Sequence, residues 1–242
     1  MLKNTWTSQE PTEAQAGRAD ASATIASRFS LRGASCLSTT KMKLFCSLTS
    51  PYARKVRVVI DELGLAEQVE EAFTDPFSPP PELLVANPLS RIPTLISDRG
   101  EALPDSRLII EYLQARGRPL AALPRGTQRW AALRRLQLAE GIMDAAVATV
   151  LEKRRPEGII YTGFLDRQAE RIRRAAEALN HEAAALSLRA VGLIEITTGV
   201  ALAYLDFRMP YLEWRRGHEP LMQWFESFSR RPSMLKTQPP AG

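Results

Sequence analysis

The sequence predicts an α/β half followed by an all-α half, and two observations support this expectation. Over residues 42–118, apolar runs of strand length alternate with helical patterns, which is typical of a small mixed sheet with helices packed on it. Over residues 127–242, apolar residues recur at helical spacing and no further strand pattern follows. The chain has 242 residues, and at roughly 100–200 residues per domain this length fits one large or two modest domains.

The elements of the first half follow from the spacing of its apolar residues. Between residues 52 and 63, Val56, Val59, Ile60 and Leu63 lie at helical spacing, and Gly64 follows as a typical C-cap. Turn residues at 98–100 separate two short strands. In chain order we expect a strand Lys43–Leu48, a helix Tyr52–Leu63, a strand Val69–Phe73, a loop with at most a short helix over Pro76–Pro88, strands at Ile92–Ser97 and around Ala102–Leu103, and a helix Asp105–Gly117.

The second half is expected to be a bundle of helices. Its most apolar stretch, Ala190–Leu205, contains Glu195 and is too short to span a bilayer, so we expect the central buried helix there. The expected helices are Thr127–Lys153, Tyr161–Leu188, Gly192–Phe207 and a pair within Tyr211–Arg230.

Residues 1–41 differ in composition from the rest. They are rich in Ser, Thr and Ala and lack apolar periodicity, so we expect a disordered N-terminal extension. Met42 directly precedes the first strand pattern and is an alternative start of the protein, in which case Cys36 is incidental.

Composition and charge exclude several kinds of function. Two cysteines and two histidines, His181 and His218, are too few and too scattered for a zinc site, and these histidines are expected to be surface or capping residues. The chain carries a net charge of +5, but most bases after residue 41 stand beside acids, so we expect solvated helix faces and no nucleic-acid partner.

The segment Thr49-Ser50-Pro51-Tyr52-Ala53-Arg54-Lys55-Val56-Arg57 lies between an expected strand and an expected helix. Such a junction exposes free backbone N–H groups and the positive end of the helix dipole, which stabilise a thiolate. Ser50 before Pro51 is equally a good helix N-cap followed by proline at the first helical position. This segment alone favours the helix-capping interpretation.

Two further segments carry motifs that combine with the first segment. Asn87-Pro88-Leu89-Ser90-Arg91-Ile92-Pro93-Thr94-Leu95 is followed by Leu103-Pro104-Asp105-Ser106-Arg107. Together with the first segment, these resemble the thioredoxin-like N-terminal domain of the glutathione S-transferase superfamily, and most closely bacterial members with a serine-type SPYxRKVR motif. The resemblance extends from Met42 to the C-terminus. It implies a thioredoxin-like glutathione-binding domain over residues 42–118 and an all-α domain over residues 127–242.

The resemblance also implies roles for residues of the site. Ser50 would activate the glutathione thiol, and the Ile92-Pro93 peptide would be cis, with the backbone of Ile92 pairing with the cysteinyl part of glutathione. Asp105 and Ser106 would hold the γ-glutamyl end, although both also suit a helix cap. Arg91 is a candidate for the glycyl carboxylate.

Differences in sequence from related proteins reduce the number of reactions expected at this site. Glutaredoxins and omega-like transferases carry cysteine at the junction, whereas Ser50 cannot form a mixed disulfide. Tyr52 is the second-choice hydroxyl and Thr49 a further rival, while Cys46 is expected in the sheet core. Gly192 stands where the family has a hydroxyl residue in its helix-capping box, although Glu195 can still reach back to the backbone.

The expected function is that of a glutathione transferase, in which the glutathione thiolate attacks a small electrophile. The pocket for the electrophile is expected between the halves, partly on the helix with Met143 and Asp144. Glutathione is the expected co-substrate, with no metal, no nucleic acid and no membrane as partner, and we expect a cytoplasmic homodimer with a detoxification role. The alternatives are a non-catalytic binding or regulatory protein of the same fold and a glutathione-dependent reductase or peroxidase.

Overall fold

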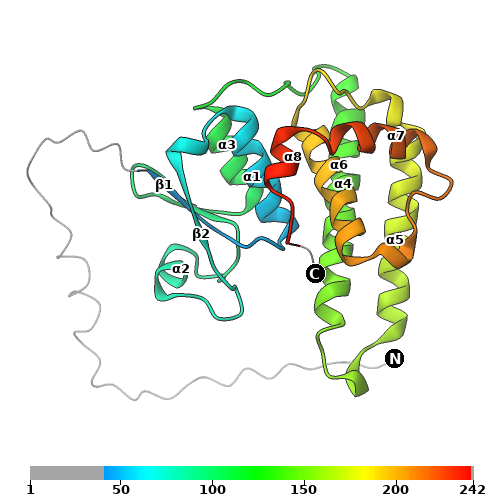
Figure 1. Ribbon diagram of the computed structural model, residues 1–242, viewed down its shortest axis with the longest axis horizontal. Coiled ribbons are helices and arrows are strands. Elements are labelled where there is room, and N and C mark those ends of the chain that lie inside the picture. Colours follow the sequence, from blue (N-terminus) through cyan, green and yellow to red (C-terminus); the bar gives the residue numbers. More distant parts are fainter. Residues whose placement is uncertain (1–40, 241–242) are drawn as a thin grey trace, which may run out of the picture. The chain divides into compact units, whose positions relative to one another are not determined.

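The computed structural model describes residues 41–240, and the expected disordered extension, including Cys36, lies outside them except for its last residue. Within the described residues, a four-stranded mixed sheet with three helices precedes a mostly helical half, which confirms the predicted fold class (Figure 1). In chain order the elements are β1 Met42–Cys46, α1 Pro51–Leu63, η1 Ala66–Gln68, β2 Val69–Phe73, α2 Pro81–Ala86, β3 Thr94–Ile96, β4 Ala102–Pro104, α3 Ser106–Gln114, α4 Gln128–Glu152, η2 Glu157–Ile159, α5 Thr162–His181, η3 Ala183–Ala185, α6 Leu193–Arg208, η4 Pro210–Leu212, α7 Glu219–Phe228 and α8 Pro232–Lys236.

The sheet has the strand order β2-β1-β3-β4. β1 pairs in parallel with β2, whereas β1 with β3 and β3 with β4 are antiparallel. Phe45 of β1 pairs with Thr94 of β3. This register places the Ile92-Pro93 peptide beside the end of β1, where the chain turns into α1.

Helix α1 begins one residue before its predicted start and ends at the predicted residue, Leu63. Ser50 is its N-cap, Pro51 occupies the first turn, and Gly64 adopts a left-handed conformation at φ 73° as the C-cap. α1 packs against α3 and also contacts α6 and α8 of the second half. It is therefore buried on more than one side, which explains why even Arg54 and Lys55 are buried.

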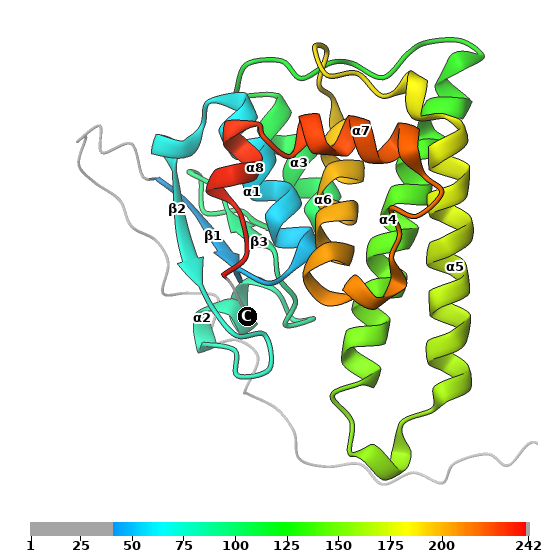
Figure 2. The same cartoon turned by 45° about the vertical axis from the view of Figure 1, so that its right-hand side comes forward.

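The second half contains the long helices α4 and α5, which lie side by side in both views (Figure 2). α6 packs on α4, and its residues Ile196, Val200 and Leu202 are fully buried. The expectation that residues 190–205 hold the central buried helix is thereby confirmed, with α6 beginning at Leu193.

Several boundaries differ from the sequence prediction. β3 spans only Thr94–Ile96, because Pro93 has no N–H to donate to a strand pairing. α5 ends at His181 instead of Leu188, and the side chain of Glu182 is bound there by Arg134 and Arg135 of α4. The alanine-rich run after it forms only the short turn η3, so tertiary contacts override its helical propensity.

The C-terminal segments form three pieces where a pair of helices was expected. η4 and α7 account for the expected pair, while α8 was not predicted. α8 lies against α1, and the Glu62 carboxylate of α1 accepts hydrogen bonds from Arg231 Nη2 at 2.8 Å and Ser233 Oγ at 2.6 Å. The end of the second half is thus bound to the first half.

Among the helices of residues 41–240, none is both long and apolar enough to cross a bilayer. α6 is the most apolar helix of the second half by sequence, yet it has only 16 residues. A bilayer-spanning helix needs about 20 apolar residues.

Candidate functional site

Ser50 lies at the junction between β1 and α1, as the sequence indicated. Its Oγ accepts a hydrogen bond from the backbone N–H of Ala53 at 3.3 Å, so Ser50 does cap the helix. The hydroxyl proton has no acceptor among residues 41–240. A serine hydroxyl carries one donor and two acceptor positions, so capping leaves the donor free for a ligand at the positive end of α1.

The two rival hydroxyls are placed differently. Tyr52 donates its hydrogen bond to the Asp144 carboxylate of α4. Burial and this hydrogen bond raise the pKa of Tyr52, which keeps its proton on the ring oxygen. Thr49 lies before the helix and caps nothing in the described chain. Of the two hydroxyls that keep a free donor, Ser50 is the one at the N-cap of α1, and Thr49 is one residue further from the helix.

Asp105 is the N-cap of α3 and adopts an unusual backbone conformation, with φ 74° and ψ 137°. A non-glycine residue with such a φ costs about 1–3 kcal/mol, and strain of this kind is concentrated at ligand-binding positions. One carboxylate oxygen accepts the Arg107 N–H at 2.7 Å. The rest of the exposed carboxylate is open to a ligand.

Ser106 follows as the first residue of α3 and is only 4% exposed. Its hydroxyl takes part in no hydrogen bond within residues 41–240. Pro104 at the end of β4 pairs with Thr94 of β3, and Thr94 pairs with Phe45 of β1. Asp105 and Ser106 therefore follow β4 at the same edge of the sheet at which the chain leaves β1 toward Ser50.

The loop before β3 is fixed by its own side chains. The buried Asn87 amide donates to the carbonyl of Arg91 at 3.1 Å and to Thr94 Oγ1 at 2.9 Å. The Ile92-Pro93 peptide is cis, as the resemblance implied. Within the described chain the backbone of Ile92 makes no hydrogen bond, which leaves its N–H and C=O for a ligand, and the Arg91 side chain is exposed.

A buried polar cluster behind Asp105 escaped the sequence analysis. Lys55 of α1 is 1% exposed and donates to the Glu140 carboxylate of α4 at 3.0 Å. Arg107 of α3 binds the same carboxylate through Nε at 3.1 Å. Burial lowers the pKa of Lys55 to about 8, and the nearby charge of Asp105 opposes this fall. The cluster joins both halves directly behind the candidate glutathione site.

The sequence carried only a weak signal for this cluster. Lys55 stands one position from Val56, within the apolar pattern of α1, but a lysine at such a position also suits a solvated helix edge. Its partner Glu140 lies 85 residues further along the chain, and no local pattern connects the two.

Cys46 is the last residue of β1 and is fully buried. Burial raises the pKa of its thiol to about 12, with a further contribution from Glu71. The thiolate is the reactive form of cysteine. The expectation of a sheet-core cysteine without a redox role thus agrees with its position.

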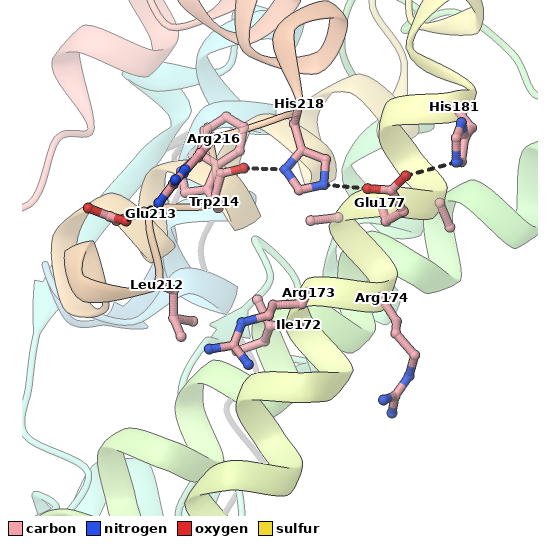
Figure 3. A pocket seen from close by; sticks show the side chains of 12 residues that line it. Ile172, Arg173, Arg174, Glu177, His181, Leu212, Glu213, Trp214, Arg216 and His218 are labelled. Atoms are coloured by element: carbon pink, nitrogen blue, oxygen red, sulfur yellow. Dashed lines mark hydrogen bonds and ion pairs between the residues drawn. The ribbon is translucent and has the colours of Figure 1, made fainter.

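The two histidines lie far from this site, around a surface pocket between α5 and the η4–α7 segment (Figure 3). His218 contacts the Trp214 carbonyl at 2.5 Å and the Glu177 carboxylate at 2.9 Å. His181 contacts the other oxygen of Glu177 at 2.9 Å. His218 therefore joins the segment before α7 to α5, whereas His181 pairs with Glu177 within α5 itself. The described residues contain no group of three or more His, Cys, Asp or Glu residues that could hold a metal.

Comparisons with known proteins give a consistent result. The family model "Glutathione S-transferase, N-terminal domain" matches residues 44–119, and the model "Glutathione S-transferase, C-terminal domain" matches residues 162–227. The uncharacterized GST-like protein YibF of Escherichia coli K12 is 32% identical over 203 residues, which cover 82% of this chain and 99% of YibF. A stringent starvation protein A homolog of Pasteurella multocida is 35% identical over 128 residues, or 48% of this chain and 59% of that protein.

Solved structures agree. A glutathione transferase family member from Pseudomonas fluorescens Pf-5, with bound glutathione, is 40% identical, has a TM-score of 0.77, and aligns over 83% of this chain and 100% of its own. A glutathione S-transferase from Methylobacillus flagellatus KT, also with glutathione bound, is 35% identical with a TM-score of 0.74, over 83% and 100% of the two chains. With both family models matched in order on the predicted fold, the chain belongs to the glutathione S-transferase family.

Proposed function

We propose that the protein is a glutathione transferase in which Ser50 activates the thiol of glutathione. The observation that carries this proposal is the free hydroxyl proton of Ser50 at the N-terminus of α1. A hydrogen bond to sulfur, together with the helix dipole, favours the thiolate over the thiol. A cysteine thiol has a reference pKa of about 8.5, and each unit by which it falls corresponds to about 1.4 kcal/mol of preferential thiolate stabilisation.

In the proposed reaction, the thiol proton passes to water and the Ser50 hydroxyl stabilises the resulting thiolate. The sulfur lone pair forms a bond to an electrophilic carbon of the second substrate. In a substitution the leaving group departs with its bonding electrons, and in an addition the electrons move into the acceptor, which then takes a proton from water. Ser50 acts throughout as a hydrogen-bond donor and forms no covalent bond.

Glutathione itself would be held by groups from two segments, the start of α3 and the loop before β3. Asp105 would bind the α-ammonium of the γ-glutamyl end, and Ser106 with the first N–H groups of α3 would bind its α-carboxylate. The backbone of Ile92, presented by the Ile92-Pro93 peptide, would pair with the cysteinyl part. Arg91 is the proposed partner of the glycyl carboxylate.

The relatives support this proposal. Two solved relatives at 40% and 35% identity hold glutathione. Another structure of the Pseudomonas fluorescens family member, 38% identical here, holds S-(propanoic acid)-glutathione, in which the sulfur is already substituted. A site that holds both glutathione and an S-substituted glutathione is what conjugation requires.

The test is the pKa of the glutathione thiol when bound, followed by ultraviolet absorbance of the thiolate, together with turnover of a chloronitrobenzene electrophile. In Ser50→Ala we expect the bound thiol pKa to rise by about one unit, the size of one lost hydrogen bond to a charged group. Ser50→Thr should restore the wild-type value because it keeps the hydroxyl. Ser47→Ala, in the same loop, is the matched control. An unchanged thiol pKa and turnover in Ser50→Ala would contradict the assignment of Ser50.

Two alternatives give different outcomes. A non-catalytic binding protein would show no conjugation, and absence of binding to glutathione-agarose as well would favour it. A glutathione-dependent reductase or peroxidase would bind glutathione but turn over disulfides or peroxides in place of the chloronitrobenzene.

We also propose that the protein is a cytoplasmic homodimer. Val85 and Leu89, next to the glutathione-binding loop, are 86% and 70% exposed, and a partner subunit would bury such side chains. Light scattering coupled to size-exclusion chromatography would give twice the chain mass of 26.9 kDa. A monomeric mass would rule the dimer out.

A further inference from the structure

Basic and aromatic side chains gather where α4 and α6 end. Arg154, just after α4, places its guanidinium carbon 4.9 Å from the centre of the Phe77 ring, which belongs to the first half. Arg208, the last residue of α6, lies 4.1 Å from the centre of the Phe207 ring. Tyr204 is one turn before Arg208 on α6. We refer to Arg154, Tyr204 and Arg208 as the donor cluster.

The donor cluster lies on the side of the molecule that holds the candidate thiol site. Thr74, just after β2, donates its N–H to the Cys46 carbonyl at the end of β1 at 2.8 Å, and Phe77 follows three residues later. Arg154, which lies against the Phe77 ring, is therefore at the strand ends from which the chain leads to Ser50.

The other end of the cluster lies beside the end of α4. Lys153 donates to the Tyr211 hydroxyl at 2.9 Å, so the end of α4 contacts the segment that follows Arg208. Burial raises the pKa of Tyr204, whereas the charge of Arg208 and its hydrogen bond with Tyr204 oppose that rise.

The cluster contains one buried donor without an acceptor. This donor is Arg208 Nε, which has no hydrogen-bond partner within residues 41–240. Tyr204 is only 7% exposed, and its hydroxyl donates to no acceptor in that part of the chain. A buried donor without an acceptor costs about 1–3 kcal/mol, more when it is charged, so such groups call for an explanation.

Nearby carboxylates do not supply the missing acceptors. Asp206, two residues before Arg208, is bound through both oxygens by Arg215, with Oδ2 at 2.6 Å. Glu152, two residues before Arg154, accepts the Tyr161 N–H at 2.9 Å and contacts Arg155.

Asp144 of α4 is a third carboxylate, and it accepts the hydrogen bond of the Tyr52 hydroxyl. These three carboxylates therefore supply no acceptor for Arg208 Nε or for the Tyr204 hydroxyl proton.

The ends of two helices explain part of this arrangement but not all of it. The C-terminus of a helix carries about half a negative charge and attracts cations. Two such ends amount to about one negative charge against the two full positive charges of Arg154 and Arg208. They also leave the buried Arg208 Nε and the Tyr204 hydroxyl without acceptors.

We propose that the second substrate of this transferase carries a carboxylate, which Arg208 and the Tyr204 hydroxyl bind while Arg154 adds positive charge. A carboxylate matches this set, because its two planar oxygens can accept from a guanidinium and a hydroxyl together. The proposal rests on the proposed function, since it places the carboxylate on the group that glutathione sulfur attacks.

Conjugates of glutathione test the proposal without any need for turnover. We would measure by calorimetry the binding of S-(4-carboxybenzyl)glutathione and its carboxamide isostere, and of S-(2-carboxyethyl)glutathione and its carboxamide isostere. The pairs differ in reach, and within each pair only the charge changes. We expect the carboxylate of at least one pair to bind about tenfold more tightly, the effect of one charge-assisted hydrogen bond.

Variants assign the preference to the cluster. In Arg208→Gln and in Tyr204→Phe, the carboxylate-to-carboxamide ratio should fall toward one. Arg167→Gln is the matched control, because Arg167 also lies over an aromatic ring, 5.3 Å from the centre of Tyr161, on the exposed side of α5. It should keep the wild-type ratio. Tyr204→Phe decides the matter if Arg208→Gln does not fold.

The outcomes separate the two proposals. Equal affinity for both members of both pairs in the wild-type protein would overturn the carboxylate proposal, as would a ratio that survives both variants. If the wild-type protein did not bind unsubstituted glutathione, the proposed function itself would be overturned.

Discussion

Burial decides the chemistry of individual side chains in the first half. Cys46 and Lys55 are both ionisable and both fully or almost fully buried, one in β1 and the other in α1. In each case burial favours the neutral form, so the pKa of the thiol rises and that of the ammonium falls. The sequence identified Cys46 as a core residue because it stands in an apolar run, whereas Lys55 could be recognised only from its distant partner Glu140.

Cys46 should be inert toward alkylation in the folded protein. With a pKa of about 12, its thiolate is scarce at pH 8, and the side chain is shielded from reagent. We expect iodoacetamide at pH 8 to leave Cys46 unmodified in the native protein and to modify it in urea. Mass mapping of tryptic peptides checks this, because cleavage after Lys41 and Lys43 separates Cys46 from Cys36. Rapid native modification of Cys46 would show that β1 opens.

Lys55 should make stability depend on pH in the alkaline range. Its pKa is about 8 in the folded protein, against a usual value of 10.5. Between these values the unfolded chain binds more protons, so this group makes the free energy of unfolding rise with pH from about 8 to about 10.5. In Lys55→Met, urea unfolding across this window should lose that rise relative to wild type. Parallel pH profiles for the two proteins would contradict it.

At the scale of elements, local patterns predicted which helices and strands exist, and tertiary contacts decided where they end. β2 matches its predicted bounds and α1 differs by one residue, because turn and cap residues mark their ends. α8 was not predicted, since a five-residue helix owes its stability to the surface of α1 on which it lies. Gly192 replaces the family's capping hydroxyl because a Cβ there would lie 2.7 Å from the Ala121 carbonyl, while Glu195 still accepts the Gly192 N–H at 2.9 Å.

Replacing a helical glycine by alanine should change the free energy of unfolding in opposite directions at two positions. A Cβ on Gly199 of α6 would overlap the ring of Phe228, which is fully buried and stacked on Trp224. Gly141 of α4 has no such neighbour within 4 Å. Gly199→Ala should therefore destabilise the protein by about 1–3 kcal/mol, and Gly141→Ala should stabilise it by about 0.5–1 kcal/mol. Urea unfolding measures both, and a stabilising Gly199→Ala would contradict the packing of α6 on α7.

At the scale of the molecule, the two halves are joined by charged groups that the sequence could not pair. The resemblance located Ser50, Asp105 and Ser106 through short local motifs. The ion pair of Glu62 with Arg231 spans 169 residues and has no local signature. Burial disfavours ionisation of Glu62, but hydrogen bonds from Arg231 and Ser233 outweigh it and lower its pKa.

Glu62 should contribute to stability at neutral pH and lose that contribution in acid. A carboxyl whose pKa is lower in the folded protein stabilises it above its usual value of 4.5, and the effect disappears as the pH falls through the folded pKa. Glu62→Gln should lower the free energy of unfolding at pH 7 by about 1–3 kcal/mol, with a smaller difference from wild type at pH 3. Glu67→Gln, on an exposed turn, is the control. Equal losses at both pH values would contradict an ionic contribution.

The buried cations of α1 have a consequence for recombination between relatives. Arg54 donates to the Met234 carbonyl of α8 at 3.1 Å, Lys55 to Glu140 of α4, and Arg57 to Glu71 of β2. A chimera that joins this first half to the second half of another transferase inherits two cations whose acceptors lie beyond the crossover. Such a hybrid should express in folded form only where the donor of the second half supplies an acid at position 140 and a backbone acceptor at position 234. The first half therefore cannot be exchanged between relatives independently of the second, because the buried cations of α1 need acceptors there.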